Sequence, residues 1–300
     1  MFDTEHVRCD LCNSDEAKIM EGYNHAARLP DSVSIMRCRK CGLVYMNPRP
    51  TLAAYRNMYE GGEFYQDYQG RVTKYAHLFP QTYEIIEKYK PDKGSLLEVG
   101  CATGEFLNVG CQRGWQVIGT DASQSLAEVG KTKYGVEIIV SSSVKAIAWP
   151  AEQFDVVYAS HVMEHLPSPS ATLRELWRVL KPGGLILIQV PNEFEDLLYV
   201  LFRWLATKRY KRGGAPIFDH VYFFSPQTMT RMVEQTGFSL LEISTWQNRN
   251  RRNFLASRYP GGKYIKRGLF AAGGLIGRGP NIEVIAAKSA SLTTPGQQVE

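Results

Sequence analysis

The sequence predicts an α/β protein built on a doubly wound, mainly parallel sheet of seven strands, preceded by a small cysteine-rich module. Three observations predict this arrangement. Short apolar segments alternate with amphipathic segments of helical spacing from residue 95 to residue 190, two further apolar segments follow, and two Cys-x-x-Cys pairs lie within the first 41 residues. Such alternation is typical of parallel sheets whose helices cover both faces.

Each element of the sheet follows from its own local pattern. Apolar runs predict strands at 96–99, 116–120, 137–140, 154–159, 184–190, 238–245 and 282–287. Helical spacing predicts helices at 104–113, 125–134, 169–179 and 225–236. The last of these has a start signal, Ser225-Pro226, and a stop signal, Gly237. In such sheets ligands bind beyond the carboxyl ends of the strands.

The chain divides into four parts by composition. Residues 1–47 form the cysteine module, and residues 48–92, rich in tyrosine, form a helical linker or cap. Residues 93–290 form the α/β domain, with insertions at 195–224 and 247–280 that we expect to cover an acceptor. Residues 291–300 are expected to be a flexible tail.

The overall composition is that of a soluble globular protein, with 44% apolar and 22% charged residues and a net charge of +5. The N-terminus shows no signal-peptide pattern, and no apolar run approaches the ~20 residues that span a bilayer. A cytoplasmic location is therefore expected. Residues 243–282 contain no acidic side chain and could face phosphates or a membrane, or could simply be a solvated basic loop. The amphipathic segment 197–212 fits a lid or a peripheral membrane contact.

A glycine-rich loop follows the first strand of the α/β domain. In the segment 98–104, Glu-Val-Gly-Cys-Ala-Thr-Gly, small residues allow a sharp turn and close approach of the backbone to a ligand. Asp121 ends the next strand, where a carboxylate can accept both hydroxyls of a ribose. By themselves these features also fit a generic dinucleotide-binding turn in which Asp121 caps a helix.

The loop resembles the first motif of class I S-adenosylmethionine-dependent methyltransferases. Three further blocks match that family in order: residues 154–161 resemble its fourth strand, residues 162–166 the segment after it, and residues 178–184 the turn before its fifth strand. The resemblance implies a Rossmann-like methyltransferase fold. It departs from the family pattern at Ala102, where glycine is commoner.

The resemblance also implies roles for individual residues. The methionine portion of S-adenosylmethionine would be lined by Glu98, Gly100, Cys101, Ala102 and Gly104. Asp121 would bind the ribose, with Ala122 beside it, and Ser142 or Ser143 would face the adenine, since no acid occupies that loop. Ser160 and His161 would lie near the methyl donor.

The four N-terminal cysteines, Cys9, Cys12, Cys38 and Cys41, have the number and pairing of a closed tetrahedral zinc site. We therefore expect a structural Zn²⁺, with an extended hairpin between the pairs at residues 18–37; reactive or redox thiols are the alternative. Cys101 and Cys111 are interpreted as packing residues.

Three histidines are candidates for the catalytic base: His161, His165 and His220. Histidine is the usual proton acceptor near neutral pH. Tyr222 is a candidate helper for His220. The alternative is that Glu164 orients a structural His165 and that His220 only fixes its loop.

The combination of cysteine module, catalytic domain and the 220–226 block resembles bacterial methyltransferases of deoxysugar, antibiotic and surface-polysaccharide pathways. This implies a small-molecule or glycan acceptor, above all a nucleotide-linked sugar, methylated on oxygen or carbon. The alternatives are an RNA methyltransferase, a lipid- or quinone-type methyltransferase, and a non-catalytic cofactor-binding scaffold. The acidic character of the N-terminal module makes a nucleic-acid partner unfavourable. The sequence leaves the oligomeric state open.

Overall fold

The structure of the protein is a computed structural model that describes residues 3–20, 32–51, 53–54, 76–193, 220–246 and 278–289. Several sequence predictions lie outside these residues: the tip of the 18–37 hairpin, most of the 48–92 linker, most of the 195–224 and 247–280 insertions, the amphipathic segment 197–212 and the tail 291–300. Among the helices of the described ranges, none has the length and apolar character needed to cross a bilayer.

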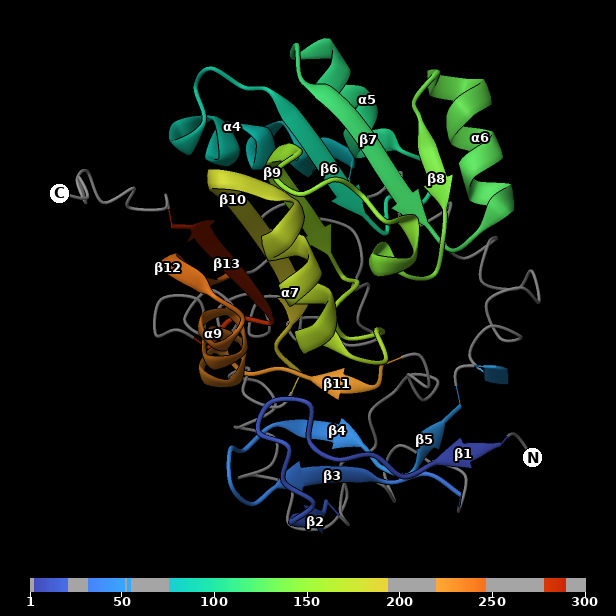
Figure 1. Ribbon diagram of the computed structural model, residues 1–300, viewed down its shortest axis with the longest axis vertical. Helices are drawn as coiled ribbons and strands as arrows, with labels where there is room; N and C mark the ends of the chain where they lie inside the picture. Colours follow the sequence, from blue (N-terminus) through green and yellow to red (C-terminus); the bar gives the residue numbers. More distant parts are fainter. Residues whose placement is uncertain are drawn as a thin grey trace, which may run out of the picture.

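The main domain is a seven-stranded sheet in the order β12-β13-β10-β9-β6-β7-β8 (Figure 1). Its strands are β6 (Ser95–Val99), β7 (Gln116–Asp121), β8 (Ile138–Val140), β9 (Phe154–Ser160), β10 (Leu180–Pro191), β12 (Phe238–Trp246) and β13 (Asn281–Lys288). Neighbouring strands from β10 to β8 pair in parallel, while β13 is antiparallel to both β10 and β12. The predicted doubly wound, mainly parallel sheet is confirmed.

The helices cover both faces of this sheet, because alternate strand residues point to opposite sides. On one face, Tyr83 and Ile86 of α4 (Phe79–Tyr89) and Phe106 of α5 (Glu105–Gln112) belong to the same buried cluster as Leu96 of β6. On the other face, α7 (Pro169–Val179) and α9 (Pro226–Gln235) contribute to the cluster that contains Leu97. The remaining helical elements are α6 (Gln124–Tyr134) and the short 3₁₀ helices η1 (Ala76–Leu78) and η2 (Val144–Ile147).

Serine caps explain where three helices begin. Ser123 accepts a hydrogen bond from the backbone at the start of α6, and Ser168 does the same for α7. At α9, Ser225 and Thr228 exchange hydrogen bonds in a capping box, followed by a proline at the first helical position. The predicted start of this helix is therefore confirmed.

A second, smaller sheet forms the N-terminal module, in the order β11-β4-β3-β2 (Figure 1). Its strands are β2 (Ala17–Ile19), β3 (Ile35–Cys38), β4 (Val44–Met46) and β11 (Tyr222–Phe223), and a separate pair joins β1 (Thr4–Glu5) to β5 (Arg49–Pro50). The strand β11 comes from the α/β part of the chain, far beyond the module in sequence. This pairing of β11 with β4, which no local sequence pattern predicts, attaches the module to the α/β domain.

Side-chain contacts strengthen the attachment. Asp10 of the module accepts hydrogen bonds from the Ser168 and Ser170 hydroxyls and from the Ser170 backbone amide, at the start of α7. Arg49 donates to the carbonyl of Pro167 at 2.6 Å and pairs with Glu5 at 2.9 Å. The module therefore holds the segment that leads from β9 into α7.

Candidate functional site

The glycine-rich loop turns sharply at the end of β6. Gly100, Ala102 and Gly104 all have left-handed backbones, with φ of 69°, 49° and 72°. At Gly100 a side chain would also collide, because an added Cβ would lie 2.3 Å from Val162 Cγ2. Ala102 takes a conformation that favours glycine, which accounts for the glycine usual at this position. Gly104 is the N-cap residue of α5, so the first amides of the helix directly follow the loop.

Asp121 connects this loop to the next strand. Its Oδ2 accepts a hydrogen bond from the Ala102 amide at 2.8 Å, and its Oδ1 accepts one from the Ser123 amide at 2.9 Å. Burial raises the pKa of Asp121, while the amides of Ser123, Ala102 and Ala122 oppose the shift. The carboxylate thus lies directly against the turn.

Glu98, the last acid of β6 before the loop, is buried under it. Its Oε2 has no hydrogen-bond partner among the described residues. Burial raises the pKa of Glu98 well above its ordinary value, and the charges of Glu105 and Asp121 add to the rise. An ionised carboxylate at this place needs a positive partner that the described residues do not supply.

The third-strand loop lies next to Asp121. Asp121 pairs with Val140 in the β7–β8 ladder, and the Ser141 amide donates to the Asp121 carbonyl at 2.8 Å. Ser142 and Ser143 follow on the exposed side, with Ser143 preceding η2. The two serines predicted to face adenine therefore share an edge with Asp121 and the exposed Ala122.

Ser160 ends β9 at the same edge of the sheet, and His161 follows it. The Ser160 hydroxyl donates to Gln189 Oε1 at 3.0 Å, and the His161 amide donates to the Gln189 carbonyl at 2.8 Å. His161 has a positive φ of 54°, an uncommon conformation that a non-glycine residue keeps only when its surroundings impose it. Its half-exposed ring points Nδ1 at Glu164 Oε1, 3.4 Å away.

A cluster of one carboxylate and two imidazoles follows immediately. Glu164 is fully buried, and His165 Nε2 lies 3.9 Å from its Oε1. The rings of His165 and His220 meet edge to face, with centroids 4.7 Å apart. Burial would raise the pKa of Glu164, but contact with His161 and the charges of His165, His161 and His220 lower it to about 2. The structure thus brings together the three predicted histidines.

Backbone contacts hold this cluster in place. The amides of Val221 and Tyr222 both donate to the carbonyl of Glu164, and the Met46 amide donates to the carbonyl of Val221. The chain from His220 into β11 is therefore fixed between the Glu164 turn and strand β4. Tyr222 itself is buried, and its hydroxyl donates to the Pro167 carbonyl and accepts from Arg49, each at 3.2 Å. Its side chain contacts the module.

Glu193 is a site residue that the sequence analysis missed. It follows β10 at the carboxyl edge, is nearly buried, and lies with Oε2 at 3.2 Å from His220 Nδ1. The signal was present, because the segment Pro191-Asn192-Glu193 directly follows a strongly apolar strand. Asp10 and Arg49 were missed as well, since no local pattern marks a contact between the module and the domain.

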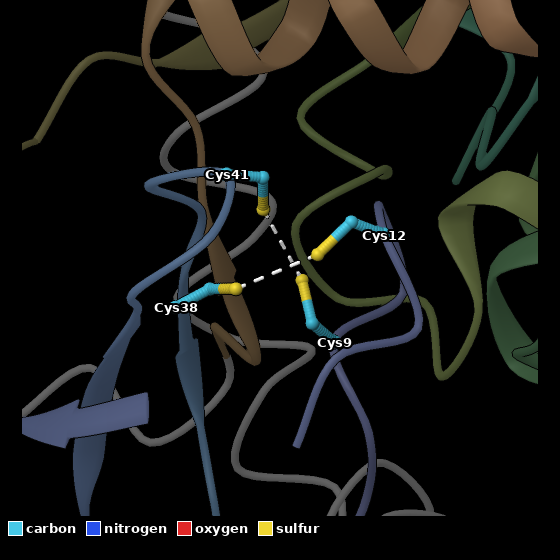
Figure 2. Close-up of side chains that lie close together, drawn as sticks. All are labelled: Cys9, Cys12, Cys38 and Cys41. Atoms are coloured by element: carbon cyan, nitrogen blue, oxygen red, sulfur yellow. Dashed lines mark hydrogen bonds between the residues drawn. The ribbon is translucent and has the colours of Figure 1, made fainter. Parts of the chain in front are cut away.

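The four N-terminal cysteines converge from two turns (Figure 2). Cys9 and Cys41 have sulfurs 3.4 Å apart, Cys12 and Cys38 have sulfurs 3.5 Å apart, and all four are free thiols. Burial opposes ionisation of Cys38, but the backbone amides of Cys41 and Lys40 lower its pKa. The cluster is compatible with a small metal-binding module.

The two other cysteines differ from each other. Cys101 is buried, and its Sγ packs where a side chain at Gly119 would lie, as predicted. Cys111 is exposed, so its interpretation as a packing residue is wrong. The reason is the orientation of α5, which buries Phe106, Leu107 and Gly110 and leaves Cys111 on the solvent side.

Sheet order, glycine-rich loop and Asp121 together define the class: an S-adenosylmethionine-dependent methyltransferase of class I. A family model described as a methyltransferase domain matches residues 68–243, more than half of the chain. The protein belongs to this family and is an enzyme of that class, which sets the scaffold alternative aside.

Curated relatives match over about half of the chain. A ubiquinone biosynthesis O-methyltransferase of Coxiella burnetii is 26% identical over 178 residues, which cover 57% of this chain and 75% of the relative. A protein of the same name from Pseudomonas fluorescens is 33% identical over 156 residues, covering 49% and 66%. A crystal structure of a methyltransferase from Archaeoglobus fulgidus is similar with a TM-score of 0.48 and 19% identity, covering 70% of this chain and 94% of that one.

Proposed function

We propose that the protein methylates a hydroxyl oxygen of a small-molecule acceptor, of the phenolic quinone-precursor type, with S-adenosylmethionine as donor. One observation carries the proposal. The carboxyl edge of the sheet holds the glycine-rich loop with the buried Glu98 and, one strand away, the cluster of Glu164, His165 and His220. Donor and acceptor groups can thus meet across β6 and β9.

The residues of the loop fit the donor. S-adenosylmethionine supplies a methyl group on a positively charged sulfur. The unpartnered Oε2 of Glu98 is suited to the ammonium of its methionine portion, and Asp121 to the ribose hydroxyls. Since an added Cβ at Gly100 would collide with Val162, the loop is closely packed against the segment that follows β9. Ser142 and Ser143 are then the groups nearest to an adenine beyond Asp121.

The histidine cluster fits the acceptor. Methyl transfer to a hydroxyl requires removal of its proton and alignment of the oxygen with the methyl carbon. We propose that His165 and His220 bind and deprotonate the hydroxyl, that Glu164 and Glu193 orient these rings, and that Ser160 and His161 line the path of the methyl group. Tyr222, whose hydroxyl contacts Arg49 and Pro167, is proposed to position β11 and not to take part in proton transfer.

The acceptor class rests on the relatives. Their name specifies O-methylation in ubiquinone biosynthesis, and a quinone precursor carries ring hydroxyls. The nucleotide-linked sugar expected from the sequence has no support in these relatives, so we place it second, as the competing acceptor in the test below. A hydroxyl of either kind would use the same chemistry at His165 and His220.

The cysteine module is proposed to hold a structural zinc ion. Tetrahedral Zn²⁺ with sulfur ligands at about 2.3 Å separates the sulfurs by about 3.8 Å, close to the 3.4 and 3.5 Å of the two pairs. Four thiolates leave no open coordination position. The metal would therefore stabilise the fold of the module, and through β4 and β11 the loop that carries His220.

The test is direct methyl transfer. The purified full chain is incubated with labelled S-adenosylmethionine and, in turn, a prenylated dihydroxybenzoate, nucleotide-linked sugars and total RNA. We expect label in the phenolic product and equimolar S-adenosylhomocysteine. Transfer only to a sugar or to RNA would contradict the acceptor class. Transfer to none of them, with cofactor binding intact, would contradict small-molecule methylation of these classes altogether.

A further inference from the structure

A second set of metal-ligating atoms lies outside the cysteine module. Glu164, His165 and His220 each offer one ligand atom, and these atoms all lie within 4.8 Å of one another. Ligands bound to one ion at 2.0–2.2 Å lie roughly 3–4 Å apart. The 3.9 Å between His165 Nε2 and Glu164 Oε1 already falls in that range.

The carboxylate of Glu164 has imidazole neighbours but no good hydrogen bond. Its side chain is completely buried, and neither carboxylate oxygen has a hydrogen-bond partner among the residues that the structure describes. The imidazoles approach Oε1 at 3.4 and 3.9 Å, distances too long for good hydrogen bonds. A buried carboxylate without donors is costly unless a cation compensates it. These separations suit ligands that share an ion better than groups that bond one another.

Glu193 supplies the outer contact that metal-bound histidines usually have. Its Oε2 lies 3.2 Å from His220 Nδ1, so Nε2 of the same ring would be the atom that binds the ion. A carboxylate on the far nitrogen fixes the tautomer and orientation of a metal-bound imidazole. Both groups are largely buried, with side-chain exposures of 12% for His220 and 4% for Glu193.

The three ligands come from segments that the backbone already holds together. Glu164 and His165 lie in the turn after β9, and the two amides that follow His220 donate to the Glu164 carbonyl. The ligand set is thus assembled by the fold.

We infer that Glu164, His165 and His220 form a second metal site, for a divalent transition-metal ion, at the acceptor edge of the sheet. Two imidazoles and one carboxylate suit Zn²⁺, Fe²⁺ or Mn²⁺ and leave coordination positions open. This distinguishes the site from the closed four-thiolate cluster.

The role of the ion rests on the proposed function. An acceptor hydroxyl bound to the ion loses its proton to solvent more readily, because the cation stabilises the oxyanion. The oxygen then bonds to the methyl carbon, the carbon–sulfur bond breaks, and its electron pair stays on sulfur as S-adenosylhomocysteine. His165 and His220 then act as ligands, and the ion replaces them in activating the hydroxyl.

The test measures metal content of the full chain after saturation with Zn²⁺ and removal of excess. We expect two equivalents in the unchanged protein and one in His165→Gln and in His220→Gln, with His77→Gln, an exposed histidine elsewhere, as the matched control. Glu193→Gln should keep two sites but weaken the second about 10- to 100-fold. Substitution with Co²⁺ separates the sites, because only the cysteine site gives thiolate-to-cobalt charge-transfer absorption.

Retention of one tightly held equivalent, with its thiolate absorption, shows that a histidine variant is folded. A single equivalent in the unchanged protein, or two in both His165→Gln and His220→Gln, would overturn the inference. These readouts do not depend on turnover. If the second ion binds and no acceptor is methylated, the proposed function fails and the metal site stands. If a phenol is methylated without a second ion, the metal site fails and the proposed function stands.

Discussion

Tyr222 of the catalytic domain lies opposite Tyr45 of the cysteine module in the β11–β4 ladder, and the two rings stack with centroids 6.4 Å apart. Both side chains are essentially buried. Since His220 lies two residues before Tyr222, the position of this histidine depends on a strand that the module supplies. The module is therefore a structural part of the proposed acceptor site.

Removal of one cysteine ligand should accordingly damage acceptor binding more than cofactor binding. In Cys38→Ser, loss of the metal would loosen β3 and β4 and with them β11, whereas the loop at Gly100 and Asp121 follows strands of the other sheet. We expect the KM for the acceptor to rise at least about tenfold, equivalent to about 1.4 kcal/mol, with the Kd for S-adenosylmethionine within about twofold of the unchanged protein. Steady-state kinetics and calorimetry measure the two quantities.

Cys111→Ser is the matched control, because this thiol is exposed on α5 and remote from the module's sheet. It should leave both constants unchanged. Equal weakening of acceptor and cofactor binding in Cys38→Ser would mean that the module supports the whole domain and has no special link to β11.

Asp121→Ala should weaken cofactor binding. The carboxylate is the acid that can accept ribose hydroxyls beside the loop, and a hydrogen bond to a charged group contributes about 1.5–3 kcal/mol. We expect a 10- to 100-fold rise in the Kd for S-adenosylmethionine, measured by calorimetry. Asp92→Ala, at an exposed acid before β6, serves as the control. An unchanged Kd in Asp121→Ala would refute the assignment of this residue.

The strands of the large sheet could be predicted because each is a short apolar run. Strands of a parallel sheet are buried on both faces, so nearly all of their residues are apolar. Asp121 and the loop were predictable for a related reason. The parallel strands β6 and β7 must end at one edge, so residues that follow them meet. The start of α9 was predictable from Ser225 and Pro226 alone, since capping is a local interaction.

Strand β11 and the contact of Glu193 with His220 could not be predicted in this way. Two residues, Tyr222 and Phe223, are too short a run to indicate a strand, and their partner β4 lies in another part of the chain. Glu193 and His220 meet only because the end of β10 and the start of β11 lie close together in space. The lack of hydrogen-bond partners at Glu98 Oε2 and at the Glu164 carboxylate, among the described residues, is likewise a property of packing and not of local sequence.

Gly100→Ala should be more destabilising than other glycine substitutions of the same backbone type. The alanine would need φ near 69° and would place its Cβ 2.3 Å from Val162 Cγ2. We expect the free energy of unfolding to fall by about 2–5 kcal/mol, the sum of left-handed backbone strain and overpacking against Val162. Gly135→Ala is the matched control, since its φ is 67° with no atom within 4 Å, and should cost only about 1–2 kcal/mol.

Urea unfolding measures these losses, and Val162→Ala in the Gly100→Ala background isolates the collision. Removal of both Cγ atoms should recover the overpacking part, about 1–3 kcal/mol, when compared with Val162→Ala alone. Equal losses in Gly100→Ala and Gly135→Ala would mean that the loop shifts to accommodate the methyl group, and that close packing against Val162 does not shape the turn.

Glu98→Gln should stabilise the free protein and weaken the cofactor complex. Burial raises the pKa of Glu98 in the folded state, so the unfolded chain, with a carboxyl pKa of about 4.3, ionises first as pH rises. The unchanged protein therefore loses stability between that pH and the higher folded-state pKa, whereas a neutral glutamine does not titrate. The stability difference should be absent near pH 4 and favour Glu98→Gln at pH 7.

In the complex, the ammonium of the methionine portion favours the ionised form of Glu98. Binding should therefore release a proton from Glu98 and be weakened about tenfold or more in the variant. Denaturation at several pH values measures the first effect, and calorimetry in buffers of different ionisation enthalpy measures the second. Parallel stability profiles for the two proteins would show that Glu98 finds a partner in the free protein, and the assignment of its orphaned oxygen to the cofactor would fall.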